Sequence, residues 1–148
     1  MKHEEFDSDG IRTIVVVFDP GDEVLPGLKS VAAERSLTAA SLTAVGAVEE
    51  ATLGWYDLGA QQYREIPIKE QAEVLSLVGD IARAPDGGPA VHAHGVLGLR
   101  DGSTRGGHLL HAKIRPTLEV VLRESPGRLQ KTYRPEFGLA LIDLDAGG

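Results

Sequence analysis

Hydrophobic and polar positions along the chain describe one helix and a series of short strands. Residues Ile11–Phe18 (IRTIVVVF) are apolar or β-branched at nearly every position, which predicts a central strand covered on both faces. The turn residues 19–22 follow, and apolar residues then recur with the helical period to about Ser36. We therefore expect one main helix that begins near Asp22 or Glu23 and packs its apolar stripe on a sheet.

After this helix the pattern changes to short apolar segments separated by glycine, proline and acidic residues. These segments predict strands at 42–48, 51–56, 63–68, 72–81, 113–123 and 137–144, in addition to the hairpin described below. The connections are too short for the crossovers that parallel strands need, so neighbouring strands should run antiparallel. The predicted fold is a single α+β domain over residues 1–148, with one main α-helix packed on an antiparallel-dominated β-sheet.

Residues Val91–Leu110 (VHAHGVLGLRDGSTRGGHLL) carry three of the five histidines in the chain. We interpret them as strand, turn and strand, which puts His92 and His94 on one face because side chains two apart in a strand point the same way. A two-residue turn at 101–102 would place His108 on the other face. A three-residue turn at 101–103, or a bulge at 106–107, would bring it beside the other two. We predict the clustered arrangement.

A cluster of three neutral imidazoles suits zinc or another divalent transition metal. Three protein ligands would leave a coordination position open for water or a substrate. The alternative is that His92, His94 and His108 are hydrogen-bonded packing residues, in the core or between subunits, without a metal. Because His-x-His is a short motif, its spacing alone favours the metal-free interpretation.

The composition narrows the possible functions. The chain has no cysteine, which excludes disulfides, iron–sulfur clusters and thiolate zinc sites. The net charge of -7 disfavours generic binding to a phosphate backbone. The apolar segments are too short to cross a bilayer, and the polar start (MKHEEFDSDG) predicts a flexible tail at 1–10 rather than a signal peptide. We therefore expect a cytoplasmic protein that does not bind membranes.

Several segments form a recognisable series along nearly the whole chain. They are Asp19-Pro-Gly21, Gly46-Ala-Val48, Glu73-Val-Leu-Ser-Leu-Val-Gly79, His92-Ala-His94, Gly106-Gly-His108-Leu-Leu110, Leu118-Glu-Val-Val121 and Phe137-Gly-Leu-Ala-Leu-Ile142. In this order they resemble the plants-and-prokaryotes-conserved (PPC) domain, and its stand-alone prokaryotic members in particular. The chain departs from the family pattern at His111, where an acidic residue is expected, and at Asp80, where asparagine is common.

The resemblance implies a compact α+β fold that assembles as a homotrimer. In plant relatives AT-hook motifs precede the domain and bind DNA, while the domain itself mediates self-association and contact with other proteins. This sequence has no Arg-Gly-Arg-Pro hook, which argues against direct DNA contact. Some prokaryotic members look like metal proteins whose ligands match His92, His94 and His108, so the resemblance favours a metal site at these residues.

Glu73 and Glu119 are the candidate catalytic carboxylates, because each lies in an apolar strand segment. Such a carboxylate could orient an imidazole, or could act as a general base with a raised pKa. The alternative, which we prefer, is that each faces solvent or forms an ion pair with Arg115 or Arg123. The sequence therefore leaves open whether the protein is an enzyme.

Three functional hypotheses remain. The first is a metal-dependent enzyme or small-molecule binder with zinc, or another divalent transition metal, at the three histidines. The second is a protein-interaction module in which metal or histidines only stabilise the trimer. The third is a DNA-associated regulator, which the net charge of -7 disfavours.

Overall fold

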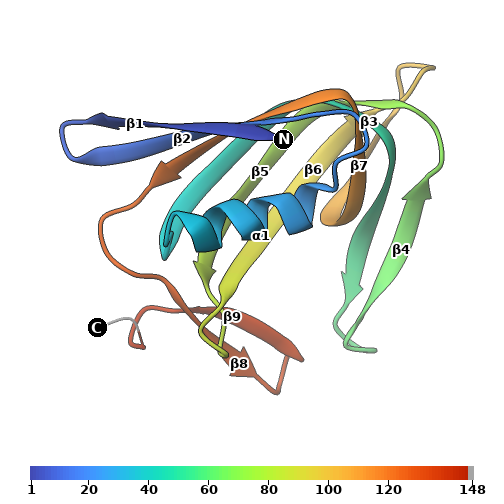
Figure 1. Cartoon of the computed structure of the whole chain (residues 1–148). Helices are drawn as coiled ribbons and strands as arrows, with labels where there is room; N and C mark the ends of the chain where they lie inside the picture. The colour runs from blue at the N-terminus through green and yellow to red at the C-terminus, as the bar shows by residue number, and fades with distance from the viewer. Residues whose placement is uncertain (147–148) are drawn as a thin grey trace.

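The computed structural model describes residues 1–146 and contains a twisted sheet with a helix against it (Figure 1). Within this range no helix is long and apolar enough to cross a membrane. The elements, in chain order, are β1 (Lys2–Ser8), β2 (Ile11–Phe18), α1 (Val24–Glu34), β3 (Ala39–Asp57), β4 (Gln62–Ile68), β5 (Ala72–Arg83), β6 (Pro89–Gly98), β7 (Thr104–Glu124), β8 (Gln130–Arg134) and β9 (Leu139–Asp143).

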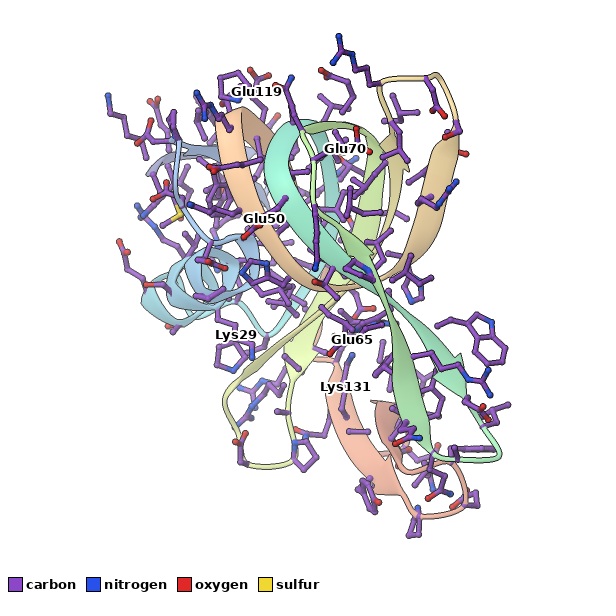
Figure 2. All side chains as sticks on the ribbon, turned by 90° about the vertical axis from the view of Figure 1, so that its right-hand side faces the viewer. Lys29, Glu50, Glu65, Glu70, Glu119 and Lys131 are labelled. Atoms are coloured by element: carbon purple, nitrogen blue, oxygen red, sulfur yellow. The ribbon has the colours of Figure 1, made fainter. Side chains whose placement is uncertain are left out.

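The strands lie in the order β1-β2-β7-β3-β5-β8-β9, with β4 paired to β3 and β6 paired to both β5 and β7. Among the described residues the strand pairings are antiparallel, apart from one parallel contact between Arg83 and Gln130. Because β3 and β6 each pair with both β5 and β7, these four strands close into a ring, which Figure 2 shows from the side of β4. The predicted antiparallel-dominated α+β fold is confirmed.

Strands β3 and β7 are longer than the sequence predicted. The segments 42–48 and 51–56 belong to one strand, and the segment 113–123 continues the second strand of the histidine hairpin. The pairing of β3 with β7 shifts register between Gly46 and Val48. Gly46 has a φ of +151°, and a side chain there would overlap the backbone of Thr117. Gly46 therefore lets β3 shift its register against β7 without ending. The prediction had ended the first of the two strands at Val48, before Glu49 and Glu50.

Helix α1 covers one face of the sheet with the stripe that its sequence predicted. Val24, Leu28 and Val31 are at most 1% exposed, and the helix packs against β6 and β7. Glu23 is the N-cap residue by backbone geometry but makes no side-chain capping bond. The largest fully buried side chains are Phe18, Ile14, Leu28, Leu42, Leu53, Ile81, Leu97, Ile114, Leu118 and Leu122. Burial of this apolar surface is the main stabilising contribution to the fold.

Within one chain, Ile11–Phe18 is covered on one face only, and the prediction of two covered faces is not met. Ile14, Val16 and Phe18 are buried, but the alternate residue Val17 is 38% exposed. Its face continues across neighbouring strands, where the exposed apolar side chains are those of Val45, Val78, Val96 and Val121. We call Val17, Val45, Val78, Val96 and Val121 the open sheet face. It lies opposite the buried face because side chains alternate along strands.

The prediction of a flexible tail at 1–10 is also wrong. Lys2–Ser8 form β1, which pairs in register with β2 from Lys2–Val17 to Ser8–Ile11. His3 and Glu5 are half-buried, and Nε2 of His3 lies 3.3 Å from a carboxylate oxygen of Glu34 at the end of α1. A polar edge strand of this kind has little apolar periodicity, so the sequence pattern did not reveal it.

Candidate metal centre

The turn between β6 and β7 brings the three histidines together. His94 and His108 are direct cross-strand partners, and the pairing continues without a shift to Gly98 and Thr104. The backbone N–H of Leu99 donates to the Ser103 carbonyl at 2.8 Å, so the turn has an odd number of residues. The prediction that a three-residue turn brings His108 beside the other two histidines is therefore confirmed. The residues of this turn are 100–102 rather than 101–103. The alternative of a bulge at 106–107 is wrong for this pair of strands.

The geometry of the cluster suits a transition metal. His92, His94 and His108 each offer one ring nitrogen, and the three atoms lie within 4.8 Å of one another. Nε2 of His92 lies 3.1 Å from Nε2 of His94. Zinc–imidazole bonds of about 2.0–2.1 Å in a tetrahedral site would separate two ligand nitrogens by about 3.4 Å. Only small movements of the rings would thus be needed to place the nitrogens around one ion.

The protonation of the cluster also fits a metal. Burial, together with the charges of His92, His94 and Lys131, lowers the pKa of His108 to about 4. Burial, with a smaller effect of His92, lowers the pKa of His94. Metal ligation requires neutral imidazoles, so these rings are in the required state at neutral pH. Within the described chain, Nδ1 of His108 is buried without a hydrogen-bond partner, and coordination of a metal cation by its lone pair would satisfy this atom.

Asp80 on β5 holds the ring of His92. The two residues are cross-strand partners, and Oδ2 of Asp80 lies 3.1 Å from Nδ1 of His92. Nδ1–H of His92 can donate to this carboxylate, which leaves Nε2 as the free nitrogen on the side of His94. Burial alone would raise the pKa of Asp80, but the hydrogen bond from His92 and the charge of Lys131 outweigh burial and lower it. Asp80 is therefore ionised at neutral pH.

The ring of Tyr63 packs on His108 from β4. The two rings are stacked, with centroids 4.7 Å apart and planes inclined by 28°. Gly54 of β3 is the register partner of His108 and lies between the two strands. A Cβ at Gly54 would stand 2.7 Å from Tyr63 Cδ1 and 2.9 Å from Leu110 Cδ1. The absence of a side chain at position 54 therefore lets the tyrosine ring reach across β3 and fix the orientation of His108.

Two hairpins are joined beside this part of the sheet. The Tyr56 hydroxyl, at the end of β3, donates to the Phe137 carbonyl at 2.7 Å. The Gln61 amide donates to the carbonyls of Pro135 and Glu136, each at 3.1 Å. Tyr56 also packs edge-on against Tyr63, with centroids 4.9 Å apart. The β3–β4 hairpin, which carries Tyr63, is thus tied to the β8–β9 hairpin, which carries Lys131.

The structure does not bring the two candidate catalytic glutamates to the histidines. Glu73 is exposed and pairs with Gly98, four residues along β6 from His94, which corresponds to about 13 Å. It lines a surface hollow of about 420 Å³ with Glu70 and Arg100. Glu119 is exposed on β7, between Val17 and Val45. Within one chain, neither carboxylate is placed to orient a ligand or to act on water at the cluster.

The sequence did not assign a role to two residues beside the cluster. Asp80 was noted only as a departure from a family pattern, and Lys131 was not singled out. Alternation along a strand shows which residues share a face with Asp80 or Lys131. It does not show which strands lie beside theirs, because that depends on long-range pairing. His111, by contrast, lies outside the cluster, with Nε2 2.8 Å from Glu23.

Comparison with known proteins finds a matching family model and several similar solved structures. The sequence model described as the Plants and Prokaryotes Conserved (PCC) domain matches residues 6–126. A search of curated proteins finds no match. Among solved structures, a plant- and prokaryote-conserved protein of Pyrococcus horikoshii is 26% identical, with a TM-score of 0.83, and the match covers 96% of this chain and 94% of that one.

Two further solved structures have names that bear on function. A metal-containing protein of Archaeoglobus fulgidus is 28% identical, with a TM-score of 0.81, and the match covers 95% of this chain and 96% of that one. A proposed DNA-binding protein of Ralstonia eutropha is 30% identical, with a TM-score of 0.82, and the match covers 88% of this chain and 90% of that one. These proteins share the fold over nearly their whole lengths.

Proposed function

The chain belongs to the Plants and Prokaryotes Conserved domain family, and on this premise we propose that it is a transition-metal protein centred on His92, His94 and His108. The observation that carries the proposal is the convergence of three ring nitrogens within 4.8 Å on one face of β6 and β7. The name of the Archaeoglobus relative, a metal-containing protein, agrees with it. Zinc is the ion we expect, because the donor set is three imidazoles, and another divalent transition metal is the alternative.

When bound, the ion would supply a Lewis acid with a coordination position open to water or a small ligand. The residues of the chain hold and orient the donors. Asp80 fixes the tautomer of His92, and Tyr63 packs on the ring of His108. Glu73 and Glu119 were the candidate general bases, and within one chain neither lies at this centre. We therefore propose that the protein binds a metal ion, and we propose no reaction at it.

We further propose that the protein assembles as a homotrimer through the open sheet face. The five valines that define this face are each 38–55% exposed. Several exposed apolar side chains on one face of a sheet are typical of a protein–protein interface. His94 belongs to the same face, because it pairs with Val78 across β5 and β6, so the metal centre borders the proposed interface.

The second candidate function is DNA association, which the name of the Ralstonia relative favours. The net charge of -7 opposes it, because binding to the phosphate backbone depends on clustered positive charge. Mobility-shift titrations at 50 and 200 mM salt would test this function. Low-salt affinity that falls steeply with salt would support DNA binding, and no measurable affinity at low salt would reject it.

The metal proposal is tested by elemental analysis of untagged protein, purified without chelator and then dialysed. We expect near-stoichiometric metal per chain in the wild type and its loss in the His92→Ala/His94→Ala double variant. His111→Ala is the matched control, because it removes a histidine outside the cluster and should retain the metal. Light scattering and circular dichroism would show whether each variant keeps its assembly and fold. A wild type that binds no metal after supplementation would leave the histidines as packing residues of a protein-interaction module.

A further inference from the structure

Lys131 is a buried cation next to the metal centre. It is 8% exposed, and among the described residues no other charged residue is buried. Its Nζ lies 3.4 Å from Oδ1 of Asp80, whose other oxygen contacts His92. Lys131 belongs to β8, and Figure 2 shows it on the side of β8 that faces the ring of strands. Asp80 therefore links the ammonium to the histidine cluster.

The contact with Asp80 leaves the ammonium incompletely satisfied. A charge-assisted hydrogen bond between nitrogen and oxygen is usually about 2.7–2.9 Å long, which is shorter than the distance here. Oδ1 of Asp80 is itself buried without a hydrogen bond among the described residues. Burial of a charged group is costly unless the group is paired and hydrogen-bonded. Lys131 thus has donor capacity that its contact with Asp80 does not use.

Lys131 also changes the charge balance around a bound metal. The three ligands are neutral imidazoles, and the single negative charge of Asp80 is matched by the positive charge of Lys131. The two positive charges of a divalent ion bound here would therefore not be neutralised by the surrounding residues. Glu65 of β4 is the nearest acidic residue in register, because Gly54 of β3 pairs with Glu65 on one side and with His108 on the other. Its side chain is exposed and does not belong to the group of converging ligand atoms. Solvent screens an exposed charge of this kind.

We infer that the three-histidine centre and Lys131 together bind a small oxyanion, a carboxylate or a phosphate group, with the metal ion and the Lys131 ammonium as its two positive partners. This inference rests on the proposed metal function. An anion would neutralise the excess charge of the centre and would engage the unused N–H groups of Lys131. The adjoining β3–β4 and β8–β9 hairpins are tied together through Tyr56 and Gln61, so Lys131 is held on a fixed support. Lys131 therefore determines the charge of the preferred ligand.

Cobalt-loaded protein would test this inference, because the visible spectrum of cobalt reports both metal ligation and binding at its open position. The protein is titrated with inorganic phosphate and, separately, with acetate. We expect saturable spectral changes with at least one anion, and Lys131→Met should weaken its binding about tenfold or more, as for removal of one partner of a buried charged contact. Lys131→Arg should stay within about threefold of the wild type, because the positive charge is retained. Lys29→Met, on the exposed side of α1, is the control and should bind as the wild type does.

The outcomes separate this inference from the metal proposal. Failure of the wild type to bind cobalt would reject the metal proposal itself. Cobalt binding without any effect of either anion, or with equal anion affinities in the wild type and a folded Lys131→Met variant, would overturn the inference alone. If Lys131→Met does not fold, acetate is compared with neutral acetamide on the wild type. We expect acetate to bind at least about tenfold more tightly; equal affinities would overturn the inference. Preference between phosphate and acetate identifies the class of oxyanion.

Discussion

Asp80 and His92 are cross-strand partners whose Oδ2 and Nδ1 atoms lie 3.1 Å apart, so a carboxylate on β5 orients an imidazole on β6. Asn at position 80 keeps an acceptor for the ring N–H but removes the negative charge. We expect Asp80→Asn to weaken metal binding by about 10- to 100-fold, as is typical for loss of a carboxylate behind a ligating histidine. Competition with a coloured chelator measures this change.

Asp86→Asn is the control for that measurement. Asp86 lies in the exposed turn before β6, where its Oδ1 accepts the backbone N–H of Gly88, and asparagine can do the same. Its metal affinity should equal that of the wild type. Equal affinities of Asp80→Asn and the wild type would show that the contact with His92 does not support ligation.

Gly79 allows β5 and β6 to approach next to the histidines. It pairs with Ala93, between His92 and His94, and a Cβ at Gly79 would overlap the carbonyl oxygen of His92. Backbone atoms in a paired strand cannot move aside, so Gly79→Ala should destabilise the fold by about 2 kcal/mol or more. Chemical denaturation would measure the free energy of unfolding of the metal-free protein.

Gly106→Ala is the matched substitution, because Gly106 is also a strand glycine near the cluster. Its added methyl group would lie 3.5 Å from the Gly95 carbonyl oxygen, which is an ordinary contact. We expect a change within about 1 kcal/mol. Similar destabilisation by both alanines would contradict the role assigned to Gly79.

Arg12 and Glu124 form a bidentate ion pair between β2 and β7. Arg12 donates from Nε at 2.7 Å and from Nη2 at 2.8 Å, and Nη2 also reaches the Arg35 carbonyl after α1. Hydrogen bonds from Arg12 lower the pKa of Glu124. The pair therefore stabilises the fold above the unfolded pKa of the carboxyl, and this contribution is lost as the pH falls through the lower folded pKa.

Glu124→Gln should destabilise the protein at pH 7 by about 1 kcal/mol, because the pair is bidentate but partly exposed. The difference from the wild type should shrink as the pH falls below about 4, the ordinary pKa of a glutamate carboxyl, and should be lost once the folded-state carboxyl is protonated as well. Urea denaturation at several pH values tests both points. Glu70→Gln, at the exposed turn before β5, should have little effect. A difference that is independent of pH would show that the charge of Glu124 is not responsible.

Val121 lies in the open sheet face, with Val15 and Thr43 as its register partners. If this face is the trimer interface, Val121→Asp would bury an unpaired carboxylate there, and we expect dissociation to monomers. Sedimentation velocity measures the oligomeric state. Leu144→Asp replaces another exposed apolar residue, 81% exposed and beyond β9, and should leave the assembly unchanged. A Val121→Asp trimer with wild-type stability would place the interface elsewhere.

The hydrophobic pattern predicted the main elements because each depends on local periodicity. β2 begins and ends where the apolar segment does, and α1 ends at Glu34, two residues before the predicted end at Ser36. The continuation of β3 past Val48 was missed, because the acidic pair Glu49-Glu50 separates two apolar segments in the way that a connection between strands does. The polar strand β1 was missed because its pairing with β2, rather than its own sequence, makes it a strand.

The candidate site divides in the same way. The face shared by His92 and His94 follows from their spacing. The face of His108 depends on whether the turn at 100–102 has an odd or an even number of residues, because this number sets the register of the two strands. The roles of Asp80 and Lys131 come from β5 and β8, and no local pattern indicates which strand lies beside β6. Glu73 and Glu119 were catalytic candidates only because their strand neighbours are apolar, and the preferred interpretation was that each faces solvent or forms an ion pair. In the structure both carboxylates are exposed.

By itself, the sequence determined the class of fold, the helix and the chemical nature of the donors, because these follow from periodicity and side-chain chemistry. The tertiary structure decided which groups surround those donors. It placed Asp80 behind His92, Tyr63 across Gly54 onto His108, and the buried Lys131 beside Asp80. Each of these contacts joins residues from different strands. Their existence depends on the register of strand pairing, which the folded chain sets through the burial of its core as a whole.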